Sequence, residues 1–257
     1  MQYELIEAET FPRAWERALK RCWNKGVEVR TELEKELDPP SRDLMAMIAV
    51  ENPEKEPRFH RAGFPMGAED LVSYMEDFIS PLKSREGPAA EDTYSNRIIG
   101  YKDNYEEEGA EAEKPEEPEE TGVDQLEYML EELERDETSK KAQAVLWNPK
   151  IDPGNYKTSP DFIRVWARIV QDELNMNVYM CSNDLFKATF SNMMAFFQLQ
   201  ELLAEKLEVK VGSYCHVADS LHINGAYHEE VENTLEELRH RDWEEKTWTS
   251  EDINKFS

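Results

Sequence analysis

The sequence is poor in cysteine and in long apolar runs, and each shortage excludes a class of protein. The three cysteines, Cys22, Cys181 and Cys215, are too few and odd in number for a disulfide framework, and they indicate a reducing compartment. No stretch approaches the roughly 18 consecutive apolar residues of a membrane span. The first residues lack a basic segment followed by an apolar run, so we expect no secretory signal there and a cytoplasmic protein.

Basic side chains are scarce relative to acidic ones. There are 30 Lys and Arg against 56 Asp and Glu, with a formal charge of -26 and a pI near 4.6. Because nucleic acids and anionic membrane surfaces are bound through clustered Lys and Arg, we expect neither as a partner. An anionic small ligand would need a local positive pocket inside this negative protein.

Two further motifs are missing: a glycine-rich phosphate loop and a His, Cys and acid cluster with zinc-ligand spacing. An apolar content of 39% is nevertheless enough for a substantial core. Residues 106–120 read EEEGAEAEKPEEPEE, which is typical of a solvated segment. We predict a single domain over 1–257 with an acidic, disordered insertion at 106–121. Adaptation to high salt and ordinary acidity remain equal explanations of the remaining charge.

The apolar pattern predicts a mixed α/β domain. Apolar residues at helical spacing predict helices from Thr10 to Gly26, Gly67 to Ser80, Val123 to Asp136, Asn192 to Leu207 and His228 to His240. Apolar or alternating runs predict strands at 44–50, 142–147 and Val209 to Val217. Met and Cys residues on these patterns are interpreted as core.

One β-hairpin can be placed more closely. Phe162 to Val170 and Leu174 to Met180 are rich in β-branched and aromatic residues, with Gln171-Asp172-Glu173 between them. A turn near Asp172 pairs Asp161 with Asn183 or Asp184. Cys181 would then lie within diagonal reach of Asp161, so we expect both side chains at one corner of the fold.

From Gly122 to Glu230 the chain resembles thymidylate synthase and the related pyrimidine hydroxymethylases. The matching stretches are GVDQLEYMLEELERDETSKKAQAVLWNP, YMCSNDLFKATFSNMMAFFQLQELLAEKL and VGSYCHVADSLHI. The resemblance implies a three-layer sheet-and-helix domain that forms a homodimer through the sheet. It also implies transfer of a one-carbon unit from 5,10-methylenetetrahydrofolate, or a related one-carbon pterin, to carbon 5 of a pyrimidine nucleotide monophosphate. Both methylation and hydroxymethylation fit.

The resemblance assigns substrate contacts residue by residue. Ser182 and Asp184 fall where the family contacts the nucleotide, and His222 falls at the histidine that contacts the ribose hydroxyl. Asn192 aligns with the asparagine that pairs with the pyrimidine edge, and an amide there suits uracil whereas a carboxylate would suit cytosine. The resemblance therefore favours a uridylate-type substrate.

The phosphate contacts are less conventional. Lys140 and Lys141 stand where the family has two arginines that reach the partner's phosphate across the dimer, and lysine binds phosphate as a point charge rather than a fork. Arg42 is a candidate for a further phosphate-binding arginine, with Arg61 and Arg97 as rivals. An ordinary surface position is an alternative for each arginine.

Three positions depart from the family pattern. Asp161 replaces the nucleophilic cysteine, Cys181 replaces an arginine, and Asn224 replaces a tyrosine. In one explanation Cys181 is a displaced nucleophile and Asp161 a general base or water-orienting group, although a nearby carboxylate raises a thiol pKa. In a second explanation the protein binds nucleotide without the family chemistry. A laboratory substitution of the cysteine is the third.

Overall fold

The computed structural model describes residues 1–31, 35, 37–85, 93–100, 122–150, 152–153 and 159–256. The acidic insertion expected at 106–121 lies outside these residues. The strands are β1 (Tyr3–Ala8), β2 (Val27–Val29), β3 (Ser41–Val50), β4 (Phe59–His60), β5 (Gln143–Val145), β6 (Phe162–Val170), β7 (Glu173–Asp184), β8 (Lys210–Ile223) and β9 (Thr247–Trp248). The α-helices are α1 (Phe11–Lys25), α2 (Ala68–Ser84), α3 (Tyr94–Ile99), α4 (Gln125–Arg135), α5 (Thr189–Lys206), α6 (His228–His240), α7 (Trp243–Lys246) and α8 (Ser250–Ile253), with 3-10 turns η1 (Gly225–Tyr227) and η2 (Asn254–Phe256).

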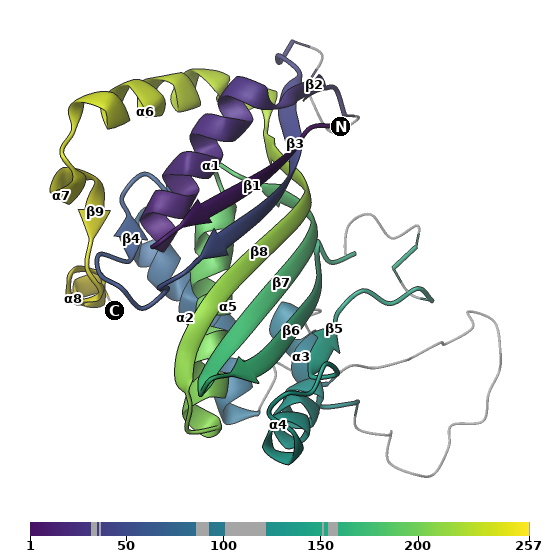
Figure 1. Ribbon diagram of the computed structural model, residues 1–257. Coiled ribbons are helices and arrows are strands. Elements are labelled where there is room, and N and C mark those ends of the chain that lie inside the picture. Colours follow the sequence, from purple (N-terminus) through teal and green to yellow (C-terminus); the bar gives the residue numbers. More distant parts are fainter. Residues whose placement is uncertain are drawn as a thin grey trace.

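A mixed sheet forms the centre of the molecule (Figure 1). Its strands follow the order β1-β3-β8-β7-β6-β5, with β2 added beside β3. The pairs β1–β3 and β7–β8 are parallel, and the other pairs are antiparallel. This architecture confirms the mixed α/β class expected from the sequence.

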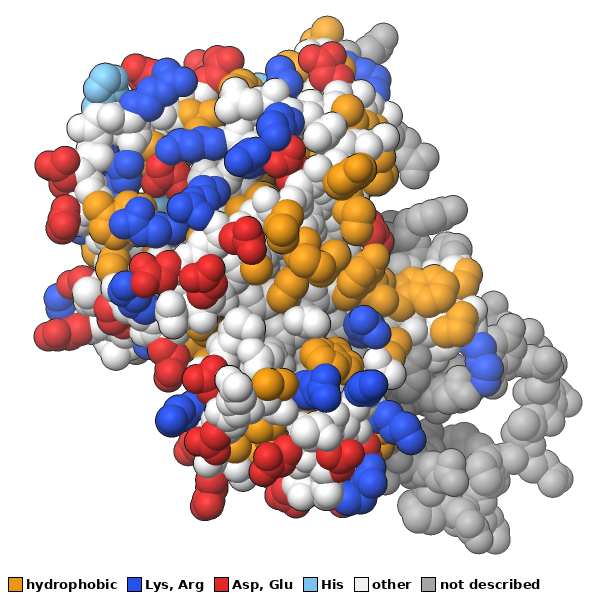
Figure 2. Space-filling view, in the orientation of Figure 1, with side chains coloured by type: hydrophobic (Ala, Val, Ile, Leu, Met, Phe, Trp, Pro, Cys, Tyr) orange, Lys and Arg blue, Asp and Glu red, His pale blue; other side chains and the backbone are white. Residues whose placement is uncertain are grey.

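Helices α1 and α5 pack against one face of the sheet, and α2 packs on α5 (Figure 1). Helix α5 is apolar on nearly every side because it lies between the sheet and α2, and its Phe190, Phe196 and Phe197 are fully buried. The opposite face of the sheet exposes apolar side chains, among them Leu5 and Met47. Figure 2 shows apolar side chains gathered across the middle of the molecule over the strands.

The hairpin of β6 and β7 turns more tightly than the sequence suggested. Gln171 and Asp172 both have positive φ angles, of 55° and 65°, which is typical of a two-residue hairpin turn. Val170 therefore pairs with Glu173, and a register irregularity between Phe162 and Arg164 follows. The expected pairing of Asp161 with Asn183 or Asp184 is wrong, since the tighter turn and this irregularity together place Asp161 beside Cys181.

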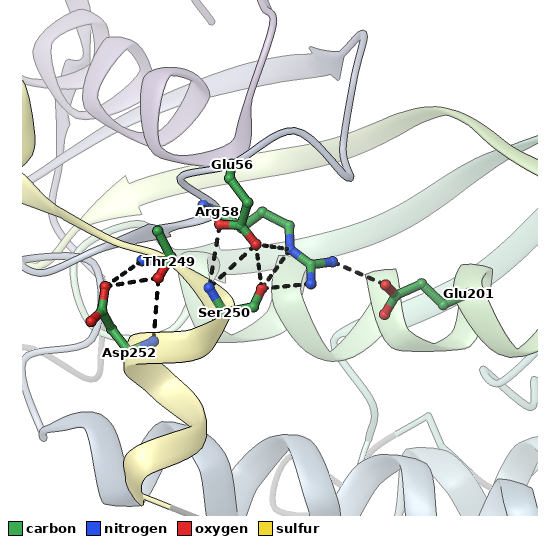
Figure 3. Close-up of polar contacts among 6 residues, drawn as sticks. All are labelled: Glu56, Arg58, Glu201, Thr249, Ser250 and Asp252. Atoms are coloured by element: carbon green, nitrogen blue, oxygen red, sulfur yellow. Dashed lines mark hydrogen bonds and ion pairs between the residues drawn. The ribbon is translucent and has the colours of Figure 1, made fainter.

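The C-terminal segment is fastened to the domain by one arginine (Figure 3). Arg58 donates from Nε to Ser250 Oγ at 2.8 Å and from Nη1 to Glu201 on α5 at 3.0 Å. Ser250 in turn donates to Glu56 at 2.6 Å. Within the described ranges no helix is long and apolar enough to cross a membrane.

Candidate active site

Asp161 and Cys181 meet where the β6–β7 hairpin begins. Asp161 directly precedes β6, and Cys181 lies on β7. The N–H of Cys181 donates to the carbonyl of Asp161 at 2.9 Å, and Cys181 Sγ lies 3.8 Å from Asp161 Oδ1. Both side chains are accessible to solvent. The expectation that these two residues share one corner is confirmed.

The thiol proton of Cys181 links the two side chains. Partial desolvation raises the pKa of Asp161, against the opposing effects of the Cys181 hydrogen bond and the His222 charge. Partial desolvation also raises the pKa of Cys181, and the Asp161 carboxylate raises it further. The thiol is therefore protonated at rest and donates to the carboxylate. Transfer of that proton from sulfur to oxygen would produce a thiolate beside a neutral acid.

Tyr94 on α3 supports this corner from the other side. Burial and the nearby Asp161 charge raise the pKa of the Tyr94 hydroxyl, which lies close to the backbone of Asp161 and Phe162. Its ring packs edge-on against Phe162 with centroids 5.5 Å apart. Tyr94 therefore packs against the residue that directly follows Asp161.

Adjacent strands place more polar groups at the same end of the sheet. In the parallel β7–β8 ladder, Ser182 pairs with Ser220 and Asp184 pairs with His222. Asp184 Oδ1 accepts from two backbone N–H groups of the following turn, and Asp184 Oδ2 accepts from Asn224 Nδ2 at 2.6 Å. Asp184 thus holds Asn224 in place, and both of its oxygens have partners within the protein.

His222 is oriented by a neighbouring serine and carboxylate. Ser220 Oγ donates to Asp43 Oδ2 at 2.6 Å and lies 3.4 Å from His222 Nδ1. In the described part of the chain, no hydrogen bond involves His222 Nε2. The ring can therefore offer this nitrogen to a ligand hydroxyl, as expected for the ribose contact.

Asn192 presents an amide at the first turns of α5, with 7% of its surface exposed. Its Oδ1 accepts from the Tyr74 hydroxyl of α2 at 2.5 Å. Its Nδ2 donates to Asn183 Oδ1 at 3.2 Å. Oδ1 keeps one lone pair, and the second proton of Nδ2 has only a long 4.0 Å contact with Met180 Sδ, which a ligand acceptor could replace. Asn192 can therefore still pair with a ligand that has one donor and one acceptor.

A cavity of about 220 Å³ opens beside Asn192. Apolar atoms dominate its lining, which includes Phe64, Leu71, Tyr74 and Lys187. Lys187 Nζ lies 2.8 Å from Glu230 and 4.4 Å from the ring centre of Tyr227. A flat, mostly apolar group with a polar edge would suit this space.

The lysine pair lies away from this corner within one chain. Lys140 and Lys141 are exposed between α4 and β5. Trp166 Nε1 donates to the carbonyl of Lys140 at 3.1 Å, and Trp166 follows Asp161 by five positions. At about 3.3 Å per residue of strand, that separation is about 16 Å. A role for these lysines at the partner's site stays a prediction.

The candidate arginines are largely occupied elsewhere. Arg42 places its guanidinium over Trp23, 5.0 Å from the ring centre, and within 4.0 Å of Glu28. Arg97 makes two 2.9 Å contacts with the buried Asp152, and Arg61 donates to the carbonyl of Thr247 at 3.2 Å. Arg61 and Arg97 therefore stabilise the fold. Arg42 directly precedes Asp43, which pairs with His222 between β3 and β8.

Several residues at the site escaped the sequence analysis, among them Asp43, Tyr74, Tyr94, Asn183, Lys187 and Ser220. Tyr74 is 118 positions from Asn192, and no local pattern signals such a contact. Asn183 and Lys187, by contrast, fall inside the stretch YMCSNDLFKATF and could have been found by counting its polar residues. The described segments contain no group of three or more His, Cys, Asp or Glu side chains that could hold a metal ion.

A family model described as thymidylate synthase matches residues 91–255, a range that contains most of this site. A provisionally named thymidylate synthase of Methanosarcina mazei is 27% identical over 234 residues, covering 90% of this chain and 94% of the relative. The deoxyuridylate hydroxymethyltransferase of Bacillus phage SP01 is 36% identical over 104 residues, or 39% of this chain and 27% of the relative. The thymidylate synthase of Bacillus licheniformis is 27% identical over 135 residues, covering 52% of this chain and 47% of the relative.

Proposed function

Because the chain belongs to the thymidylate synthase family, whose model matches residues 91–255, we propose that it transfers a one-carbon unit to carbon 5 of a uridylate-type nucleotide. The family and its named relatives support one-carbon transfer to a pyrimidine in general. The contact between Cys181 Sγ and Asp161 Oδ1 at 3.8 Å carries the proposal that this chain retains a nucleophile.

In the proposed reaction Asp161 removes the thiol proton of Cys181, and the sulfur adds to carbon 6 of the pyrimidine. The electron pair of the carbon 5–carbon 6 double bond then makes carbon 5 a nucleophile toward the methylene group. 5,10-Methylenetetrahydrofolate, or a related pterin, supplies that methylene. Carbon 5 would then lose its proton as the pterin leaves with the electron pair of its last bond to the transferred carbon. A hydride from the pterin would complete a methyl group, or water a hydroxymethyl group, while Cys181 leaves carbon 6 as a thiolate, which Asp161 can reprotonate. The donor's flat ring suits the cavity beside Asn192.

Uracil recognition is assigned to Asn192. Uracil presents the N3–H donor and the O4 acceptor side by side, and the free positions on Asn192 Oδ1 and Nδ2 complement them. His222 Nε2 is available for the sugar hydroxyl. Ser182 and Asn224 stand beside it at the ends of β7 and in the turn after β8, and we assign them to the nucleotide as well.

We propose a homodimer through the open face of the sheet. The exposed apolar side chains Tyr3, Leu5 and Met47 lie on strands of that face, and a second copy would cover them (Figure 2). In this arrangement Lys140 and Lys141 would reach the partner's nucleotide phosphate, and Arg42 would supply a further cation. These charges matter because few other basic groups lie near the site.

A nucleotide-binding protein without this chemistry is the second candidate. It is favoured by the raised pKa of Cys181, since a thiolate is needed for addition to carbon 6. The two candidates share the pocket and differ only in whether sulfur attacks the ring.

Tritium release from deoxyuridylate labelled at carbon 5 separates them. Native protein with 5,10-methylenetetrahydrofolate should release tritium, and Cys181→Ser should abolish release while deoxyuridylate still binds. Cys215→Ser is the matched control, because this thiol on β8 pairs with Asn177, four positions before Cys181 on β7, and should leave release unchanged. Binding without release in the native protein would establish the second candidate. Release that survives in Cys181→Ser would remove Cys181 as the nucleophile.

A further inference from the structure

A chain of buried hydrogen bonds runs from Asn192 into the core. Asn192 Nδ2 donates to Asn183 Oδ1 at 3.2 Å, and Asn183 Nδ2 lies 2.9 Å from His216 Nε2. His216 Nδ1 then lies 3.0 Å from the Tyr214 hydroxyl. Asn183 is 3% exposed, and His216 and Tyr214 are fully buried. The proposed reaction uses none of these three inner residues.

The direction of the chain follows from donor and acceptor counting. An amide NH2 group only donates, so His216 Nε2 must accept from Asn183. His216 is consequently the neutral tautomer with its proton on Nδ1, which donates to Tyr214. Complete burial lowers the His216 pKa to about 3, so the ring stays neutral at physiological pH.

Met180 reinforces the same direction. Its Sδ atom lies 2.9 Å from Asn183 Nδ2 and 4.0 Å from Asn192 Nδ2. A thioether sulfur accepts but does not donate, so it favours both amides with their NH2 groups turned toward it. Rotating the Asn192 amide by half a turn would place its Oδ1 against Asn183 Oδ1. This clash is avoided only if the Asn183 amide also rotates and the His216 proton moves to Nε2.

The orientation of Asn192 decides which base it can read. With Oδ1 and Nδ2 as observed, the amide complements the donor and acceptor of uracil. Cytosine carries the opposite pair, an acceptor at N3 and a donor at N4, and would need the reversed amide. We propose that Asn183 and His216 are positioning residues that lock the Asn192 amide and thereby select uracil over cytosine, an inference that rests on the proposed function.

The test compares the affinities of deoxyuridylate and deoxycytidylate by calorimetry. We expect the native chain to prefer deoxyuridylate by about tenfold or more, the usual effect of one two-bond base contact. His216→Leu and Asn183→Leu break the chain, so the affinity ratio should fall toward one. His216→Gln can still accept from Asn183, so it should retain most of the preference. Asn183→Asp can still accept from Asn192 Nδ2 once His216 takes the Nε2–H tautomer and donates to the new carboxylate, so it should retain most of the preference as well.

Gln200→Leu is the matched control. Gln200 is a fully buried amide on the same helix that donates to the carbonyls of Leu174, Gly212 and Ser213, outside the chain that ends at Asn192. Its loss should destabilise the helix–sheet contact without changing the affinity ratio. Thermal unfolding of each variant identifies those that fold. If the Leu variants do not fold, the affinity ratios of His216→Gln and Asn183→Asp and the tautomer of His216 in the native protein still test the proposal.

Nitrogen-15 spectra of the imidazole give a reading that needs no nucleotide. The proposal requires the Nδ1–H tautomer of His216, and an Nε2–H tautomer would overturn it. An unchanged ratio in the folded Leu variants would also overturn it, as would an equal loss in Gln200→Leu. A native chain that binds neither nucleotide overturns the proposed function, and the selection role falls with it. A native preference without an effect of His216 or Asn183 overturns the selection role alone.

Discussion

Asp161 Oδ1 faces Cys181 Sγ at 3.8 Å, so the carboxylate that raises the pKa of the thiol is also a base within reach of its proton. These two effects oppose each other. At rest the negative charge disfavours a thiolate, whereas during reaction the same oxygen can accept the proton. An amide at position 161 would remove both effects at once, so their consequences can be separated.

In Asp161→Asn, alkylation of Cys181 by iodoacetamide at neutral pH should accelerate, because the thiol pKa falls. The increase approaches about tenfold for a decrease of one pKa unit. Tritium release should decrease by about 10²–10⁴-fold, the usual loss on removing a general base. Burial raises the pKa of Cys22 to about 12 and that of Cys215 to about 11, so both thiols should react slowly. Labelling of Cys181→Ser measures this slow background. Parallel changes in both rates would contradict the assigned role of Asp161.

Asn224 and Asp184 offer a test of stability. Asn224→Ala removes the 2.6 Å hydrogen bond to Asp184 Oδ2 and should reduce the free energy of unfolding by about 1–3 kcal/mol, measured in urea. Asn224→Asp should cost more at neutral pH, because two carboxylates then meet, and should recover as the pH falls and one of them protonates. The exposed Asn24, which donates to the carbonyl of Lys20, is the control. An Asn24→Ala change as large as that of Asn224→Ala would argue against a specific contact.

His216 should make the fold sensitive to acid. Its pKa falls from an ordinary value of 6.5 to about 3 in the folded state because of burial. Below pH 6.5 the unfolded chain takes up a proton that the native chain does not, so stability decreases as the pH falls from about 6.5 toward 3. The limiting slope is about 1.4 kcal/mol per pH unit. His216→Gln should flatten this part of the curve in urea unfolding. An identical slope in both proteins would show that His216 is not buried and neutral.

The Arg58 contacts should determine how firmly the C-terminal segment is held (Figure 3). Arg58→Gln loses charged contacts to Glu201 and Glu56 and both contacts to Ser250. We expect faster hydrogen exchange over 248–253 and a loss of about 1–3 kcal/mol in unfolding free energy. Arg239→Gln removes an exposed helix pair with Glu236 and should change stability by less than about 1 kcal/mol. Unaltered exchange over 248–253 would mean that packing alone holds the segment.

Local pattern was sufficient for much of the fold and for one corner of the site. The spacing of apolar residues was enough to predict the helix that starts after Thr10. The turn residues around Asp172 were enough to predict the hairpin, and this hairpin brings Asp161 to Cys181. Strand β1, a short edge strand, carries too weak an alternation to be found. The partners of Asn192 were missed for another reason. Tyr74 lies 118 positions away, and the link from Asn183 to His216 spans 33, so only packing of separate elements creates these contacts.

The phosphate remains the least expected part of the ligand. The protein carries 56 acidic against 30 basic side chains, and Asp43, Asp161 and Asp184 lie at the same end of the sheet. Lys140 and Lys141 provide point charges rather than the forked contacts of arginine. A dianionic phosphate is therefore attracted by few local groups and repelled by the surrounding field.

This balance predicts an unusual salt response. Added potassium chloride shortens the range of the field to about 10 Å at 0.1 M, which weakens repulsion from distant acids more than attraction by lysines in contact. Affinity for deoxyuridylate should therefore rise from low to moderate salt, while affinity for deoxyuridine should stay constant. The double substitution of Lys140 and Lys141 by Gln should weaken nucleotide binding only. Equal binding of nucleotide and nucleoside at every salt concentration would show that the phosphate is not recognised, and that the natural substrate carries less charge at that end.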